Sequence, residues 1–182
     1  MPTQKMCGYQ YMIMFTDNHS RYTEVDIMKA KSEAPAKFKE YLEKVKKQRP
    51  KFKVCRIRVD GGGEYASHEK FLEYLAEEGI IREVSARYSQ QQNGISERCN
   101  STVLDLARSM LKHAGMLNML WAEGVSTAVN IKNQLRSRAL PNSTPFQSWT
   151  QKKSDTSHVR TFRFLAFPWI NGDLRKKLDN HA

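Results

Sequence analysis

Apolar positions along the chain alternate between two spacings that predict short strands and longer helices. Runs of apolar and β-branched residues predict strands, and apolar residues three and four positions apart predict helices. The turn-forming run 17–20 lies between the first two predicted strands, which favours a hairpin. The predicted strands are 9–15, 22–28, 54–59 and 80–84, and the predicted helices are 32–49, 67–78, 94–113 and 118–135. Strands that alternate with helices in this way indicate an α/β fold.

Residues at the ends of these segments support the predicted boundaries. Ser32 and Ser67 are of the type that caps a helix N-terminus, while Pro50, Gly79 and Gly115 end the helices before them. We expect one face of each helix to be buried. The expected inward residues are Phe38, Tyr41, Leu42 and Val45, then Phe71, Leu72 and Leu75, then Ile95, Val103, Leu106, Met110 and Leu111, and last Leu120, Trp121, Val125, Ala128 and Ile131.

Basic charge is concentrated in the last third of the chain. The 182 residues carry a formal charge of +11, with 40% apolar residues. From Lys132 onward ten basic residues stand against three acidic ones, so this stretch carries +7. Its prolines and polar runs predict an extended basic tail rather than a second core. A basic excess of this size is typical of proteins that bind polyanions, of which nucleic acid is the usual one.

Other classes of protein are disfavoured by what the sequence contains. No apolar run approaches the ~20 residues of a membrane-spanning helix, and the first residues do not resemble a secretory signal. Cys7, Cys55 and Cys99 lie far apart, which argues against a disulfide framework and a Cys-x-x-Cys zinc site. We expect no membrane partner and a reducing location, nuclear and cytoplasmic.

Two acidic residues occupy positions that suit a metal site. Asp60 follows a predicted strand and precedes Gly61-Gly62-Gly63, at a strand end where α/β proteins bind ligands. Glu97 lies in the first turn of the helix predicted from Gly94. Two such carboxylates brought together would offer hard oxygen ligands to a divalent cation. The simpler interpretations are a turn at Asp60 and a favourable helix-dipole interaction at Glu97.

The remaining polar and aromatic residues are less specific. The amides of the predicted loop 90–94 are either ordinary surface groups or donors to phosphates and bases. We expect solvated roles for His19 and His68. The three tryptophans are expected to be packing residues: Trp121, Trp149 and Trp169. The glycines 61–63 are not a P-loop, because no Gly-Lys-Ser/Thr follows.

Several short motifs, in order, are together more specific than any of them alone. They are Phe-Thr-Asp-Asn-His-Ser-Arg-Tyr (15–22), Val-Asp-Gly-Gly-Gly-Glu-Tyr (59–65), Gln-Gln-Asn-Gly-Ile-Ser-Glu-Arg (91–98), Asp-Leu-Ala-Arg-Ser-Met-Leu (105–111), Leu-Trp-Ala-Glu (120–123), Thr-Pro-Phe (144–146) and Ser-His-Val-Arg (157–160). With these motifs the chain closely resembles, over nearly its whole length, the integrase of copia-type LTR retrotransposons, a Pol polyprotein product of the retroviral integrase superfamily.

The resemblance implies a fold, an activity and a set of site residues. It implies an RNase H-like mixed sheet flanked by helices, and Mg²⁺- or Mn²⁺-dependent DNA strand transfer by an Asp-Asp-Glu triad, a polynucleotidyl transferase reaction. Asp60 matches the second Asp and Glu97 the Glu, as catalytic and metal-binding residues. Gln92, Asn93 and Arg98 match positions that contact DNA, the first two in a mobile loop. The implied partners are retrotransposon ends and target DNA, with homo-oligomers as a further expectation.

The first catalytic Asp has no match in these motifs. Asp17 belongs to a block that lies on the family's second strand, so the chain is expected to begin just after the catalytic Asp and to lack the first, central strand. We therefore expect residues 1–138 to be an N-terminally truncated core with impaired catalysis, and 139–182 to be a basic connector. Four further positions near the site differ from the family's usual residues: Gly61, Gln90, Cys99 and Ser101. The last two stand where the family commonly has basic residues.

Two other hypotheses remain open at this point. The first is a non-catalytic nucleic-acid-binding or assembly module derived from a retrotransposon, whose DNA binding would depend on salt but not on Asp60 or Glu97. The second is a decayed gene product with no function. A strand-transfer assay and a salt titration of DNA binding separate these hypotheses from an active integrase core.

Overall fold

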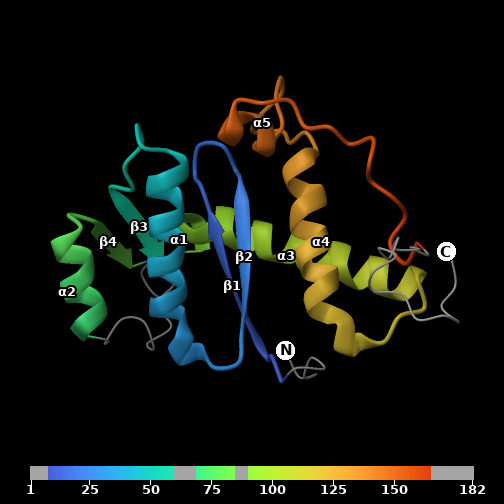
Figure 1. Ribbon diagram of the computed structural model, residues 1–182, viewed down its shortest axis with the longest axis horizontal. Helices are drawn as coiled ribbons and strands as arrows, with labels where there is room; N and C mark the ends of the chain where they lie inside the picture. The colour runs from blue at the N-terminus through green and yellow to red at the C-terminus, as the bar shows by residue number, and fades with distance from the viewer. Residues whose placement is uncertain (1–7, 60–68, 85–89, 165–182) are drawn as a thin grey trace, which may run out of the picture.

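The computed structural model describes residues 8–59, 69–84 and 90–164, and only the backbone of residues 90–93 (Figure 1). The described elements alternate between strands and helices, so the predicted α/β class is confirmed. They are β1 (Tyr11–Thr16), β2 (Thr23–Met28), a short 3-10 turn (Lys31–Glu33), α1 (Ala34–Gln48), β3 (Arg56–Val59), α2 (Glu69–Glu77), β4 (Ile81–Val84), α3 (Gln90–His113), a second 3-10 turn (Asn118–Leu120), α4 (Trp121–Gln134) and α5 (Pro145–Thr150).

The first two strands form the predicted hairpin. They pair antiparallel, in a register that runs from Tyr11 opposite Met28 to Thr16 opposite Thr23. Asp17 closes the turn, because its Oδ2 accepts hydrogen bonds of 2.7 Å from both the N–H and the hydroxyl of Ser20. An Asp side chain that accepts from nearby backbone in this way stabilises a tight turn.

The other two strands form a separate parallel pair, connected through α2. Their register runs from Arg56 opposite Ile81 to Val59 opposite Val84. Gly79 ends α2 with φ of +66°, the left-handed conformation predicted for this glycine. In Figure 1 the hairpin lies in the middle and the β3–β4 pair on the left, and no described strand joins the two pairs. The absence of a central strand between the two pairs stays a prediction.

The larger core lies between α3, α4 and the hairpin. Buried residues of α3 recur every four positions, as one face of a helix requires, and they pack against α4. The α3 residues are Cys99, Val103, Ala107 and Leu111, and the α4 residues are Trp121, Ala122, Val125, Ala128 and Val129. Gly124 allows the close approach of the two helices, since a Cβ there would lie 3.3 Å from the side chain of Leu111.

The smaller core joins α1 and α2 to the strands. It is built from Phe38, Leu42, Phe71, Leu75 and Ile80. Aromatic contacts extend it to β1: the ring of Phe15 is 4.4 Å from Tyr41 and 6.1 Å from Phe38, which in turn meets Phe71 edge-on at 5.6 Å. Burial raises the pKa of Tyr41.

Three local predictions are corrected by the structure. Ser32 does not cap α1; the N-cap is Glu33, whose Oε1 accepts hydrogen bonds from the N–H groups of Lys29 and Ala30. Leu72 is 37% exposed rather than inward, because the buried face of the short α2 consists of Phe71 and Leu75, four positions apart. The buried line of α3 includes Cys99 and Ala107, whereas Ile95, Leu106 and Met110 are only half-buried.

None of the described helices combines the length and apolar character needed to cross a membrane.

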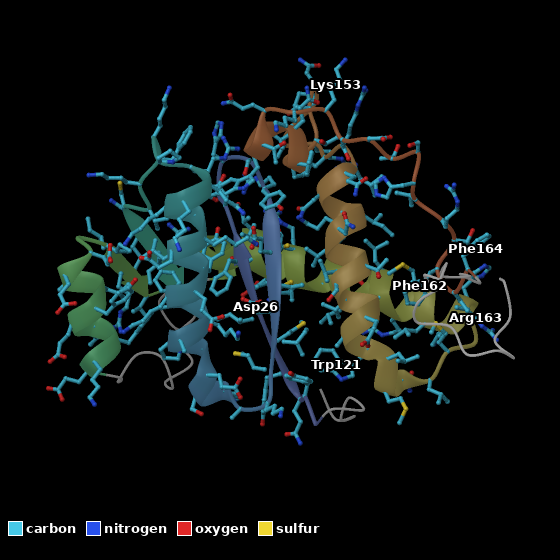
Figure 2. All side chains as sticks on the ribbon, viewed as in Figure 1. Asp26, Trp121, Lys153, Phe162, Arg163 and Phe164 are labelled. Carbon is cyan, nitrogen blue, oxygen red and sulfur yellow. The ribbon has the colours of Figure 1, made fainter. Side chains whose placement is uncertain are left out.

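The C-terminal extension packs on the core where it is described. Thr144 caps α5 by accepting a hydrogen bond of 3.1 Å from the N–H of Gln147, and Phe162 packs against the larger core. The Arg163 guanidinium donates to the carbonyl of Ala114 at the end of α3. Figure 2 shows Lys153 beyond α5 and Arg163 at the opposite end of this extension. The division at residue 138 stays a prediction.

Candidate functional site

The carboxyl ends of β3 and β4 lie at the same edge of their sheet. Because the strands are parallel and Val59 pairs with Val84, both strands end together. The next residue after β3 is Asp60, which lies outside the described residues. The chain leaves β4 at the same edge and begins α3 at Gln90, six residues later. The sheet edge therefore connects directly to the two segments that carry the predicted carboxylates.

Glu97 is exposed on α3 and free of described partners. Its side chain forms no hydrogen bond or ion pair with any residue that the structure describes. It is the eighth residue of the helix, because α3 begins four residues earlier than predicted. The helix dipole acts mainly on the first turn, so the simpler interpretation of Glu97 as a dipole partner does not hold. The side chain is available to a ligand.

Cys99 sets the rotation of α3 about its axis. Its side chain is buried, only 6% exposed, and its sulfur lies 3.6 Å from the hydroxyl of Thr16 and 3.3 Å from that of Thr23. Two residues along a helix are separated by about 200° of rotation. With Cys99 facing the hairpin, Glu97 must face the opposite, open side.

The burial of Cys99 also changes what this position implies. The sequence predicted that a missing basic residue here reduces the contacts to DNA. Position 99 faces the interior, however, so a basic side chain there would lie against two threonine hydroxyls instead of at the surface. Ser101 is exposed, and at that position the prediction stands untested.

A buried polar cluster joins the hairpin to α4 beside this contact. The Asn133 side chain accepts a 3.0 Å hydrogen bond from the N–H of Thr23 and donates one of 2.7 Å to its carbonyl. Lys132 Nζ donates to the carbonyl of Arg21 and to the hydroxyl of Thr23, both at 3.1 Å. Asn133 was not among the residues predicted from the sequence, although a polar residue on the apolar face of a predicted helix is a signal that could have indicated it.

The expected DNA-contacting residues are only partly described. Gln92 and Asn93 were predicted in a loop, but the backbone places them in the first turn of α3, which corrects that prediction. Nothing is described of their side chains. Arg98 is exposed, and its guanidinium lies next to Gly94, where a Cβ would come within 3.8 Å of it.

Asp17 is occupied by a structural role. One oxygen of its carboxylate accepts two hydrogen bonds from Ser20, and its carbonyl accepts one from the N–H of Arg21. These contacts hold the hairpin turn. They support the sequence-based view that Asp17 is not the missing member of a catalytic triad.

The donor chemistry of the predicted site fits a hard divalent cation. Carboxylate oxygens are the usual protein ligands of Mg²⁺, and Glu97 has an exposed carboxylate that pairs with none of the described residues. Among the described residues no three His, Cys, Asp or Glu side chains come together as a metal site. Asp60 lies outside that part of the chain, so the pairing of Asp60 with Glu97 stays a prediction.

Comparison with known proteins identifies relatives along the whole chain. The chain is 35% identical over 182 residues to the retrovirus-related Pol polyprotein from transposon TNT 1-94 of Nicotiana tabacum, and it spans 14% of that polyprotein. It is 26% identical over 181 residues to the one from transposon RE2 of Arabidopsis thaliana, and it spans 12% of it. No protein-family model matches the chain.

Two solved structures share the fold. A chain of the simian T-cell lymphotropic virus intasome matches with a TM-score of 0.61 at 20% identity. The match covers 93% of the present chain and 54% of the intasome chain. The HTLV-2 integrase catalytic core domain, solved in complex with magnesium in its dimeric form, matches with a TM-score of 0.54 at 19% identity. The match covers 75% of the present chain and 81% of the HTLV-2 chain. The chain is thus homologous along its whole length to a segment of the Pol polyproteins of copia-type plant transposons, and it has the RNase H-like fold of the retroviral integrase catalytic core.

Proposed function

We propose that this chain contributes the metal- and DNA-binding centre of a retrotransposon integrase, with Asp60 and Glu97 as the ligands of a divalent cation. The observation that supports it most is Glu97 itself: an exposed carboxylate without a described partner, on the open side of a helix that starts at the carboxyl edge of the β3–β4 pair. A surface carboxylate in such a position has no evident role in stability.

The proposed chemistry is transfer of a DNA strand by in-line displacement at phosphorus. Bound Mg²⁺ or Mn²⁺ would supply the charge that activates the attacking oxygen and stabilises the leaving oxygen. Asp60 and Glu97 would hold the cation, and Arg98, one residue further along α3, would offer a guanidinium to a DNA phosphate. The HTLV-2 core was solved with magnesium, which supports a metal of this kind.

We further propose that this 182-residue chain, tested alone, catalyses strand transfer only weakly. The family motifs match two of the three triad carboxylates here, and Asp17, the remaining nearby candidate, is bound in the hairpin turn. With fewer negative ligands a cation is held less tightly and less uniformly. Weak activity is therefore expected even where DNA is bound normally.

A strand-transfer assay with labelled DNA ends in Mg²⁺ or Mn²⁺ tests this function. We expect the residual activity to fall more than about 100-fold in Asp60→Asn and in Glu97→Gln, because each substitution removes a direct metal ligand. Asp105→Asn is the matched control, since Asp105 is an exposed carboxylate of the same helix that pairs with Arg108. Activity that survives in Glu97→Gln would refute the proposed role of that residue.

The non-catalytic alternative is favoured by the exposed basic side chains of the extension, Lys152, Lys153 and Arg160. It predicts DNA binding that weakens with salt and that is unchanged in Asp60→Asn and Glu97→Gln. Loss of strand transfer in these two variants, together with intact salt-dependent binding, supports the catalytic proposal. Absence of strand transfer in the unmodified protein, with the same binding, supports the alternative.

A further inference from the structure

Basic residues are unusually dense between α1 and β3. From Lys44 to Val59 the sequence has eight basic residues and no acidic one. Four of them are paired: Lys44 with Glu24, Lys46 with Glu43 and Glu78, and both Arg56 and Arg58 with Glu83. The other four form no ion pair with a carboxylate in the described part of the chain: Lys47, Arg49, Lys51 and Lys53.

Among these unpaired bases lies an exposed aromatic ring. Phe52 is 59% exposed, and it lies between Lys51 and Lys53, which are exposed too. A turn holds it in place, because its N–H donates a 2.9 Å hydrogen bond to the carbonyl of Arg49 and Pro50 occupies the second position of that turn, where proline is favoured. The ring is therefore presented by a restricted backbone.

A stack of planar groups supports Phe52 from the protein side. The Arg49 guanidinium carbon lies 5.6 Å from the centre of the Phe52 ring and 5.3 Å from that of Trp149 in α5. Trp149 in turn stacks on Tyr22 at 5.3 Å, with only 2° between the planes. Figure 1 shows the elements that meet here, the end of α1, the hairpin turn and α5, at the upper edge of the molecule.

Ordinary structural roles account for only part of this arrangement. Lys46 and Lys47 in the last turn of α1 complement the helix dipole, and the contact between Arg49 and Trp149 fastens α5 to the core. Neither role extends to Phe52, Lys51 or Lys53, which lie beyond the helix and outside the contact with α5. An exposed ring flanked by unpaired lysines combines a stacking platform with phosphate-binding charges.

We propose that Lys51, Phe52 and Lys53, supported by the stacked Arg49 and Trp149 and here named with them the Phe52 surface, bind a single-stranded stretch of nucleic acid. A base would stack on the open face of Phe52, and Lys51 and Lys53 would contact the adjacent phosphates. Double-stranded DNA buries its bases in the helix and offers none to an external ring. The Phe52 surface is thus expected to prefer a single strand over a duplex, independently of the carboxylates Asp60 and Glu97.

Fluorescence anisotropy with labelled oligonucleotides of about 15 nucleotides tests the proposal. The probes are oligo-dT, oligo-rU and a duplex of the same length, all in EDTA so that no divalent metal contributes. We expect single strands to bind more tightly than the duplex. Phe52→Ala should weaken single-strand binding roughly tenfold, while Phe52→Tyr keeps it, because the stacking area is retained. A difference between the oligo-dT and oligo-rU arms reports the sugar together with the methyl group that thymine carries and uracil lacks.

The salt dependence tests the lysines separately. Lys51→Ala combined with Lys53→Ala should reduce the slope of log K against log salt by about 1.4, since each phosphate contact on a single strand contributes about 0.7. Lys46→Ala is the matched control, because this lysine belongs to the same segment but is paired with carboxylates. Leu117→Ala controls for loss of an exposed apolar side chain elsewhere.

Two results would overturn the proposal. One is unchanged single-strand affinity in Phe52→Ala, with circular dichroism showing the same fold. The other is binding of the duplex that is as tight as binding of the single strands, or tighter. Because the measurements contain no divalent metal, they stand apart from the strand-transfer assay: the Phe52 surface and the carboxylate site can fail independently.

Discussion

Thr23 is the residue where the hairpin, α3 and α4 meet. Its backbone bonds to Asn133, and its hydroxyl lies beside Cys99 and Lys132. Buried polar groups are costly unless they are hydrogen-bonded, and here each donor and acceptor has a partner. This cluster positions α3 against the hairpin and so determines which side of α3 carries Glu97.

Substitution of Asn133 should measure how much this cluster stabilises the fold. In Asn133→Ala the N–H and the carbonyl of Thr23 lose their partners, and we expect the free energy of unfolding to fall by about 3 kcal/mol. Urea denaturation followed by circular dichroism measures it. Asn130→Ala, on the exposed side of the same helix, should change stability by less than about 0.5 kcal/mol. Equal effects of the two substitutions would show that the buried hydrogen bonds contribute little.

At the scale of residues, the sequence predicted the candidate site residues better than it predicted the contacts around them. The types and spacing of residues indicated Asp60 and Glu97, and the structure adds that Glu97 is exposed without a described partner. The partners of Cys99 and Thr23 could not be predicted, because they lie 76 to 110 positions apart in the chain. No local pattern shows which distant hydroxyl will meet a given sulfur.

At the scale of elements, the parallel pair β3–β4 is held by charge as well as by its backbone. Glu83 on β4 lies between Arg56 and Arg58 of β3 and bonds to both, with Arg58 Nη2 2.8 Å from Glu83 Oε2. These two guanidinium groups, Arg58 first, lower the pKa of the Glu83 carboxyl from its usual value. The pair ends at the sheet edge that leads to Asp60.

This pKa shift predicts how acid affects stability. A carboxyl whose pKa is lower in the folded state contributes stability above its unfolded pKa, and that contribution disappears as the pH falls through the folded value. We expect Glu83→Gln to be less stable than the unmodified protein at pH 7, by the small amount typical of an exposed pair. The difference should vanish below the folded pKa. Thermal unfolding between pH 7 and pH 3 measures this.

Glu77→Gln is the control for this experiment, because Glu77 is exposed on the neighbouring α2. It should leave both the stability and its pH dependence nearly unchanged. A Glu83→Gln variant that is as stable as the unmodified protein at pH 7, and that follows the same curve into acid, would contradict a stabilising role for the Arg56–Glu83–Arg58 contacts.

The strands and helices could be predicted because their patterns are local. The hairpin, the left-handed Gly79 and the extent of α4 follow from turn residues and apolar spacing within short windows. The start of α3 could not, because the Gln-rich run before Gly94 has no apolar periodicity and Gly94 itself disfavours a helix. In the structure the helix nevertheless begins at Gln90. Glu97 therefore lies beyond the first turn, where it had been predicted.

At the scale of the whole molecule, α1 joins the hairpin to the β3–β4 unit. It contacts β1 through Tyr41 and α2 through Phe38, and Ile57 of β3 packs against the same core. In Figure 1 α3 passes behind the hairpin. Among the described residues the two pairs form separate two-stranded sheets. Trp149 was predicted to be a packing residue, and it stacks on Tyr22. The packing of Phe162 on the larger core was not predicted, since the prolines and charges of the extension indicate an open tail.

Binding of Mn²⁺ to the protein tests most directly whether Asp60 and Glu97 form one site. Isothermal titration of the unmodified chain should reveal a specific Mn²⁺ site, and Asp60→Asn and Glu97→Gln should each weaken it at least about tenfold. Asp105→Asn should bind as the unmodified chain does. An affinity unchanged in Glu97→Gln, or lowered equally in Asp105→Asn, would contradict a metal site shared by Asp60 and Glu97.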